Sequence, residues 1–136
     1  MFIERAVTWL IGRAARRRRA RGGLGERGEA VAEAYLRRAG LHILARNWRC
    51  PRGEIDLVAR ERDVLVFVEV KTRRTDDRPE DAVDRRKRTR LRRAADAYLR
   101  RHPVGRDGVV GWRFDVVAVV LPEDGAPTVR HHVRAF

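Results

Sequence analysis

Three charged residues interrupt two runs of Val, Ile, Leu and Phe near the middle of the chain. Asp56 lies within residues 53–59, while Glu69 and Lys71 lie within residues 64–73. Carboxylates that are held close together repel one another and are costly to bury unless a cation joins them. Carboxylate oxygens suit Mg²⁺ or Mn²⁺, and a neighbouring ammonium group can orient a water or stabilise negative charge in a transition state. The spacing therefore predicts a metal site for hydrolysis.

These side chains meet if the two runs form a hairpin around Arg62-Asp63. Residue 56 then lies opposite Glu69, and Lys71 shares the face of Glu69 because side chains alternate along a strand. Glu54 joins the same face. Arg-Asp is not a favoured two-residue turn, and a slip of one residue would separate the two carboxylates. The alternative is a surface ion pair between Glu69 and Lys71, but the valine-rich flanks favour a buried sheet.

The two runs resemble the YraN-like family of uncharacterised bacterial proteins, which is similar to archaeal Holliday junction resolvases of the PD-(D/E)XK nuclease superfamily. Asp56 and Glu69-Val70-Lys71 match the superfamily motif, and the resemblance covers roughly residues 22 to 121. It implies an α/β fold with a restriction-endonuclease-like core, in which helices flank a mixed central sheet of four to five strands. The element order expected from the sequence fits the same architecture.

The resemblance also implies a function, a metal-dependent endonuclease that hydrolyses DNA phosphodiester bonds, with branched or structured DNA as one candidate substrate. Asp56 and Glu69 would hold Mg²⁺ or Mn²⁺, assisted by Glu29 and Glu54. Glu29 matches the glutamate of the family's Gly-Glu pair, although an acidic residue is also favourable at a helix N-terminus. Lys71 would orient the attacking water, which displaces the leaving oxygen in line.

The chain is strongly basic, with 32 Lys and Arg residues against 19 acidic residues and a formal charge of +13. This charge favours a polyanionic partner, nucleic acid before an acidic membrane, although an arginine-rich coding bias gives the same excess. Lys71 and Lys87 are the only lysines, and their compact ammonium groups mark candidate sites of chemistry. The predicted phosphate contacts, for which a solvated basic face is the alternative, are Lys87, Arg73, Arg74, Arg86 and Arg90.

A helix is expected over residues 26–39, ending at Gly40. Glu29 lies three residues before Ala32, at the edge of the apolar stripe, so it is expected to face the sheet, whereas Glu33 turns outward. A strand over residues 41–48 follows. Its Trp48 is expected in the core, with stacking on a base as the alternative.

A second helix is expected from residue 80 or 81 to about residue 101, with Lys87 on its core side. The polar residues 74–79 before it predict a mobile loop. Residues 112–121 form a further strand, in which Asp115 is interpreted as a structural residue in contact with Lys87 or the backbone.

Residues 128–134 are expected to form a short edge strand. Its neighbouring residues His131 and His132 alternate faces, so the two cannot bind one metal from a single strand. Both histidines are expected to be exposed.

Residues 1–21 show apolar residues at helical spacing followed by arginines, which predicts a basic amphipathic extension before a nuclease-like domain over residues 22–136. The extension would contact lipid or nucleic acid, or pack on the protein itself. The single cysteine, Cys50, fits a reducing cytoplasm. No apolar run reaches the length of a membrane span, so stable membrane insertion is not expected.

Two rivals to the nuclease remain. The first is a non-catalytic nucleic-acid-binding module with the same fold, and the second is a membrane-surface protein anchored by residues 1–21. RNA is not excluded as the ligand. A homodimer is one expectation, because the similar resolvases work as dimers.

Overall fold

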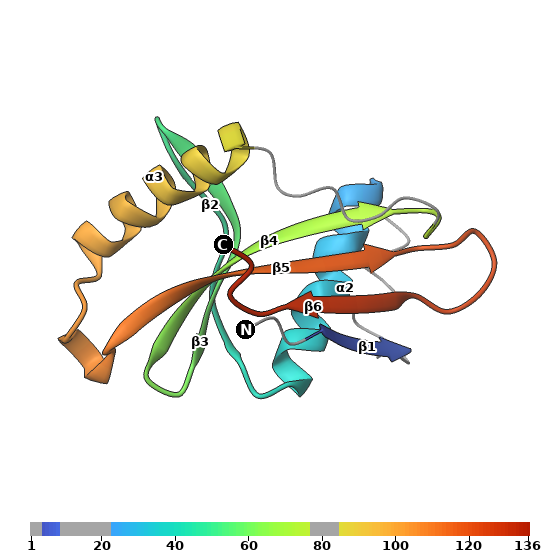
Figure 1. Ribbon diagram of the computed structural model, residues 1–136, viewed down its shortest axis with the longest axis horizontal. Coiled ribbons are helices and arrows are strands. Elements are labelled where there is room, and N and C mark those ends of the chain that lie inside the picture. Colours follow the sequence, from blue (N-terminus) through green and yellow to red (C-terminus); the bar gives the residue numbers. More distant parts are fainter. Residues whose placement is uncertain (1–3, 9–22, 77–84) are drawn as a thin grey trace.

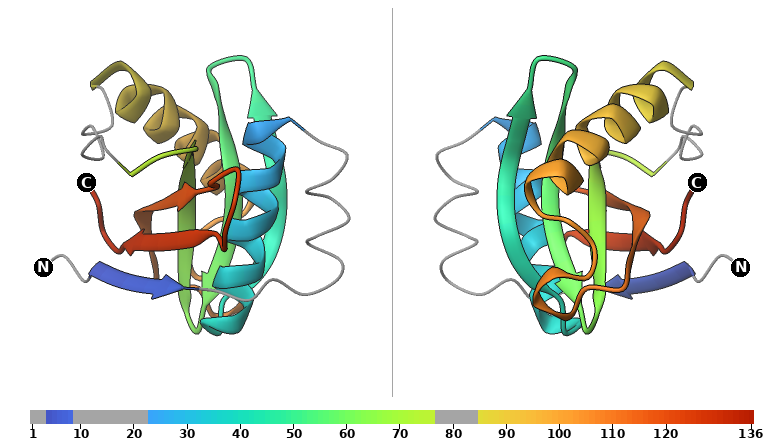
Figure 2. Two further views of the ribbon diagram at one scale, coloured as in Figure 1. Left: turned by 90° about the vertical axis from the view of Figure 1, so that its right-hand side faces the viewer. Right: turned by 90° about the vertical axis from the view of Figure 1, so that its left-hand side faces the viewer.

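The computed structural model describes the backbone of residues 4–8 and, with their side chains, residues 23–76 and 85–136. These residues form one six-stranded sheet in the order β1-β6-β5-β4-β3-β2. Helix α2 covers one face of the sheet and α3 the other (Figure 1, Figure 2). The elements are β1 (Glu4–Thr8), α2 (Leu24–Arg38), β2 (His42–Cys50), β3 (Gly53–Glu61), β4 (Val64–Arg73), α3 (Arg85–Arg101), the 3₁₀ turn η1 (Arg106–Gly108), β5 (Gly111–Val120) and β6 (Thr128–His132).

The predicted α/β class with a mixed sheet between helices is confirmed. Strands β4 and β5 are parallel, while every other neighbouring pair in the sheet is antiparallel. The parallel pair follows from the connection, because α3 carries the chain from the end of β4 back to the start of β5. The start of the α3 prediction and residues 77–79 of the predicted loop lie outside the described residues.

The N-terminal segment adds a strand that was not predicted. The helical prediction for residues 1–21 is wrong at residues 4–8, which pair antiparallel with β6. Strand β6 would otherwise present unpaired backbone groups at the edge of the sheet, and pairing satisfies them. β6 is therefore not an edge strand. Residues 9–21 of the prediction lie outside the described residues, and the division at residue 22 stays a prediction.

Two apolar clusters hold the helices on the sheet. On the α2 face, the fully buried Leu36 packs in one cluster with Val66 of β4. On the α3 face, Leu91 and Tyr98 pack in a second cluster with Phe67. Alternation along β4 thus sends successive residues into different cores. No helix in the described parts of the chain is long and apolar enough to cross a membrane.

Glu33 on α2 does not turn outward as predicted. Its side chain is buried because Arg46 of β2 and Arg37 of α2 bind it, with 2.7 Å between Arg46 Nε and Glu33 Oε2. Burial opposes ionisation, but the hydrogen bonds from Arg46 and Arg37 lower the pKa of Glu33 below its usual value. Charged groups this close favour ionisation over burial of a neutral acid, so the pair fastens α2 to β2.

A glycine sets the closest approach of α2 to the sheet. A Cβ atom at Gly28 would lie 1.7 Å from Thr72 Oγ1 and 2.6 Å from Thr72 Cβ. This contact lets the backbone of α2 touch β4 next to Glu29.

Gly28→Ala is therefore expected to destabilise the protein by about 1–3 kcal/mol, because the helix must move off the strand. The control is Gly25→Ala in the same helix, where a Cβ has nothing within 4 Å and stability should hold or rise. Urea denaturation of both variants measures the difference. Equal stability of the two variants would contradict this packing.

Candidate functional site

The hairpin that carries the acidic residues has the predicted register. It turns at Arg62-Asp63, where Arg62 has a φ of 55°. The paired residues run from Glu61 and Val64 to Leu57 and Val68. The register places position 56 level with position 69, as expected from the sequence.

Asp56 lies where the two strands separate. Backbone pairing between β3 and β4 ends at Leu57 and Val68, and beyond this point β3 pairs with β2 and β4 with β5. The Asp56 side chain bridges the gap, since Oδ2 accepts a hydrogen bond of 2.8 Å from the Val70 N–H. It also accepts one from the Glu69 carboxyl group. A protonated Glu69 therefore stabilises the neighbouring Asp56 carboxylate.

Burial is the main influence on this pair. Burial, followed by the neighbouring Asp56 carboxylate, raises the pKa of Glu69 to about 7. Burial likewise raises the pKa of Asp56, although the hydrogen bonds from Val70 and Glu69 oppose this shift. A cation bound between these two carboxyl groups would favour their ionised forms and offset the repulsion between their charges.

The pH dependence of stability should reveal this pair. The unfolded chain releases the Glu69 proton near its ordinary pKa of 4.5, whereas the folded protein keeps it until about pH 7. Stability should therefore fall as pH rises across this window, by on the order of 3 kcal/mol in the absence of metal. Urea denaturation at pH 5 and pH 8 measures the fall in wild-type protein and in Glu69→Gln, which lacks the titrating group. A stability difference between the two proteins that is independent of pH would contradict this expectation.

Glu29 and Glu54 lie beside the pair. Burial, then the Asp56 carboxylate, raises the pKa of Glu29, and the charge of Glu54 acts on both Glu29 and Asp56. Glu54 itself is exposed and forms an ion pair of 3.2 Å with Arg49. Asp56 and Glu69 thus lie side by side, while Glu29 and the exposed Glu54 interact with Asp56 through their charges. Sequence reasoning missed Asn47, which donates a hydrogen bond to Glu29.

The two lysines lie near the same group of acids. The positive charges of Lys87 and then Lys71 lower the pKa of Glu69, in opposition to its burial. Lys71 is half-buried on the face of β4 that carries Glu69. Lys87 is exposed, so the predicted core-facing position is wrong. The buried positions of α3 begin at Leu91, so Lys87 precedes the part of the helix that packs in the core.

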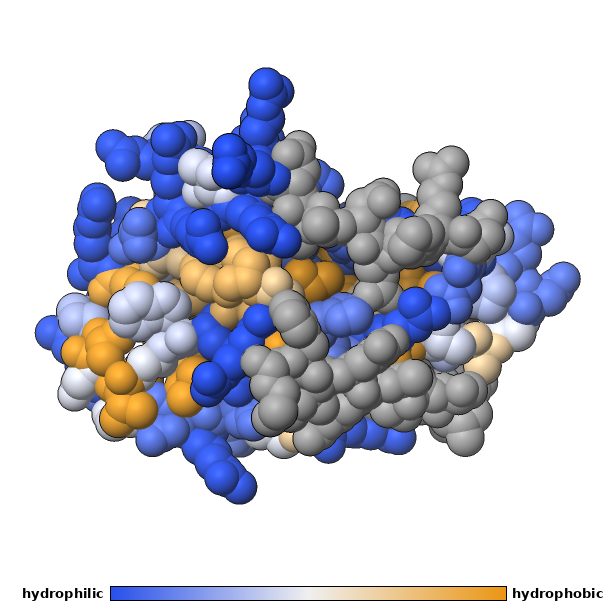
Figure 3. All heavy atoms as spheres, in the orientation of Figure 1, coloured by the Kyte–Doolittle hydropathy of each residue, from blue (hydrophilic) through white to orange (hydrophobic). Residues whose placement is uncertain are grey.

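The predicted phosphate contacts fall on two surfaces. Arg86 and Arg90 are exposed with Lys87 on α3, where hydrophilic side chains project along the upper left of the molecule (Figure 3). Arg73 is half-buried on β4 beyond Lys71. Arg74 is exposed after β4 and lies 4.0 Å from Glu123.

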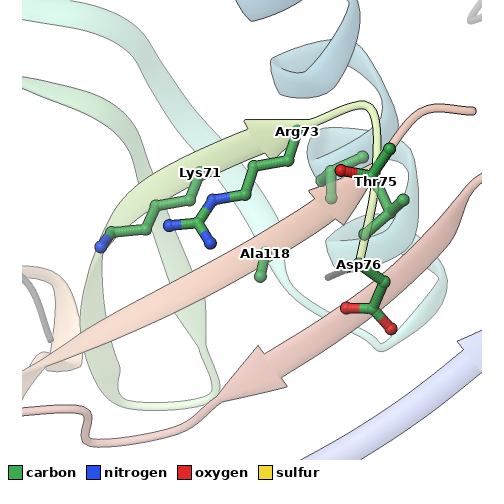
Figure 4. Close-up of a pocket in the computed structure, with 7 residues that line it drawn as sticks. Lys71, Arg73, Thr75, Asp76 and Ala118 are labelled. Carbon is green, nitrogen blue, oxygen red and sulfur yellow. The ribbon is translucent and has the colours of Figure 1, made fainter. Parts of the chain in front are cut away.

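A small pocket lies over the parallel strands β4 and β5. Lys71 and Arg73 project from β4 along one wall of this pocket (Figure 4). Thr75 and Asp76 lie at its other end, beyond Ala118 of β5.

Two other predictions concern Asp115 and His131. Asp115 is structural, as interpreted, and fully buried. It accepts hydrogen bonds from Arg113 Nε at 3.0 Å and from the backbone N–H of Arg134 at 3.0 Å. The predicted exposure of His131 is wrong, since its Nε2 lies 2.7 Å from Asp115 Oδ2 and its Nδ1 lies 3.4 Å from Tyr35 Oη. β1 covers the outer side of β6, so the histidine is enclosed between β5 and α2.

The acidic residues fit a hard divalent cation in their chemistry. Carboxylate oxygens are the preferred ligands of Mg²⁺ and Mn²⁺, and Asp56 and Glu69 supply them side by side. Among the described residues no group of three His, Cys, Asp or Glu side chains is arranged to hold a metal. Mg²⁺ commonly binds through one or two carboxylates and keeps water or substrate oxygens for its other positions.

Comparison with known proteins gives one consistent result. The model of the family described as "Uncharacterised protein family UPF0102" matches residues 28–119. The chain is 49% identical over 114 residues to a UPF0102 protein of Streptomyces griseus, which covers 82% of this chain and 94% of that protein. It is 50% identical over 115 residues to one of Streptomyces coelicolor, covering 82% and 87%, and 52% identical over 101 residues to one of Moorella thermoacetica, covering 71% and 80%. The matched range contains the acids and both lysines.

Proposed function

The chain belongs to the uncharacterised protein family UPF0102, and from its acidic site we propose that it is a Mg²⁺- or Mn²⁺-dependent endonuclease that hydrolyses DNA. The membership confirms the YraN-like part of the resemblance. The further similarity to archaeal Holliday junction resolvases and the PD-(D/E)XK superfamily is part of this proposal, as are a homodimeric state and a cytoplasmic location.

One observation carries the proposal. Asp56 and Glu69, from two strands that separate at this point, lie side by side in a half-buried site, where burial and the Asp56 charge raise the pKa of Glu69 and the charge of Lys71 opposes this. An ordinary surface ion pair does not raise the pKa of a glutamate to about 7. Strongly shifted acids beside a basic surface are typical of functional sites.

Each residue of the acidic site has a separate role in the proposed reaction. Asp56 and Glu69 would hold the cation, with Glu29 and Glu54 at the edge of the site. A cation bound there would neutralise charge on the phosphate and lower the pKa of a water. The Val70 N–H fixes the orientation of Asp56. Lys71 is placed to orient the attacking water or to stabilise charge on the phosphate, as its compact ammonium suits.

Basic residues on both sides of the acids would bind the neighbouring phosphates. Lys87, Arg86 and Arg90 project from α3 on one side. Lys71 and Arg73 line the pocket on the other side. A strand bound to both surfaces would pass across the acids without ending there, which favours internal cleavage.

The test combines metal binding with cleavage. Calorimetry should detect Mn²⁺ or Mg²⁺ binding, and the protein should cut DNA only when one of these ions is present. Duplex, single-stranded, flap and four-way junction DNA, with matched RNA, would identify the preferred substrate. Binding of nucleic acid without metal binding and without cleavage of any substrate would reject the nuclease.

The rival is a nucleic-acid-binding module with the same fold, favoured by the net charge of +13. Loss of the Asp56 carboxylate separates the two. A binding module with Asp56→Asn should keep its nucleic-acid affinity, and it has no metal-dependent activity to lose. Removal of residues 1–21, followed by liposome and DNA binding, tests the membrane-surface alternative.

A further inference from the structure

Strand β2 is irregular at two places: the register with β3 shifts between Ile43 and Ala45, and Asn47 has an unusual backbone conformation opposite Asp56. Asn47 has a φ of 47°, in the left-handed region that Asn tolerates better than most residues. It lies across from Asp56, between residue pairs that follow the regular register on both sides. A kink at this position therefore faces the acid that bridges β3 and β4.

The alternation of side chains breaks on both strands at this position. On β2, Ala45 and Trp48 both pack toward α3 although they are three residues apart. On β3, Ile55 and Val58 do the same. Regular strands place such residues on opposite faces. The alternation of side chains between the two faces is therefore interrupted on both strands at the same level of the sheet. Asn47 and Asp56 lie at this interruption.

Two adjacent residues of β2, Arg46 and Asn47, contact α2. Arg46 binds Glu33, with 2.7 Å between Nε and Oε2, and Asn47 donates a hydrogen bond to Glu29. Glu29 and Glu33 are four residues apart, so they lie on one face of the helix. The first contact fastens α2 to β2, and the second links the same strand to Glu29, on which the Asp56 charge acts.

We propose that Asn47 is a positioning residue of the acidic site, which holds the Glu29 carboxylate toward Asp56. An amide suits this role because it donates a hydrogen bond without adding charge to a group of four acids. The effect on metal binding rests on the proposed function, whereas the Asn47–Glu29 hydrogen bond does not.

The hydrogen bond can be tested without metal. Asn47 is the only Asn in the chain and there is no Gln, so its side-chain NH₂ gives the only amide pair of that kind in an ¹H–¹⁵N NMR spectrum. Glu29→Ala should shift this pair, while Glu26→Ala, at an exposed position one turn earlier on α2, should leave it in place. An amide pair that does not respond to Glu29→Ala overturns the proposal.

Metal affinity tests the positioning role. Asn47→Gly keeps the left-handed backbone and removes the amide, so Mn²⁺ affinity by calorimetry should fall about tenfold or more. In a Glu29→Ala background the same change should have almost no effect, because Asn47 acts through Glu29. An equal loss in both backgrounds would contradict the proposal.

The control for backbone relaxation is Arg62→Gly, at another left-handed position on the far end of the hairpin, which should bind Mn²⁺ like wild type. If wild-type protein binds no Mn²⁺, the nuclease proposal fails, and the NMR experiment still decides the role of Asn47.

Discussion

Glu69→Gln should reduce Mg²⁺-dependent DNA cleavage by about a thousandfold or more. The substitution keeps the size of the side chain and removes one of the two adjacent carboxylates that would hold the cation. A bound metal contributes several kcal/mol to a phosphoryl transition state, and about 4 kcal/mol corresponds to a thousandfold in rate. Single-turnover cleavage with saturating protein measures the chemical step and excludes a change in DNA affinity.

The matched control is Glu123→Gln, the same chemical change at an exposed position after β5, which should cleave at the wild-type rate. Glu69→Gln should still bind DNA without metal, because it removes negative charge from a basic surface. Cleavage by Glu69→Gln at the wild-type rate would remove Glu69 from the mechanism.

Asp115→Ala should destabilise the protein by about 3–5 kcal/mol. The Asp115 carboxylate has no solvent exposure and lies between Arg113 and His131. The Arg113 side chain is only 12% exposed. Without Asp115, the described residues leave Glu61, at 3.0 Å, as the ion-pair partner of its guanidinium. Breaking a buried ion pair by removing one member leaves a charge without compensation. Urea denaturation at pH 7 measures the loss.

The comparison is Asp63→Ala, which removes an exposed carboxylate from the β3–β4 turn and should change stability by less than about 0.5 kcal/mol. The hydrogen bonds of Asp115 lower its pKa despite burial. Its contribution is thus complete at pH 7 and is lost only as the pH falls through the lowered pKa. A loss below about 1 kcal/mol in Asp115→Ala would show that the network adds little to stability.

The central hairpin could be predicted because its signals are local. Valine-rich alternation and a short polar break fix two strands and the register that places residues 56 and 69 level. The charges within these runs then predict which residues meet. Local patterns of this kind depend on neighbours along the chain, so a single sequence contains them.

Features that depend on distant partners could not be predicted. Residues 4–8 have helical spacing, yet they form a strand because β6 offers an unpaired edge. His131 is polar, yet it is buried because Asp115 and Tyr35 bind it. Lys87 has the spacing of a buried position, yet it is exposed, and the buried positions of α3 begin only at Leu91. In each case tertiary packing outweighs the local pattern.

Asn47 illustrates a different limit. Its side chain carries no charge, and its position inside a predicted strand marks no chemistry. Its left-handed backbone and its contact with Glu29 arise only when β2, β3 and α2 pack together. A lone Asn within a strand pattern is the one signal in the sequence, since Asn is uncommon in strands.

The order of the strands also has a kinetic consequence. Strands β2, β3 and β4 are consecutive in both sequence and sheet, so their loops close at little entropic cost and Asp56 and Glu69 meet early in folding. Strand β5 docks only after α3 has crossed the sheet. Strand β1 pairs with β6, more than a hundred residues later in the sequence, so this edge of the sheet can form only after residues 128–132 have been synthesised.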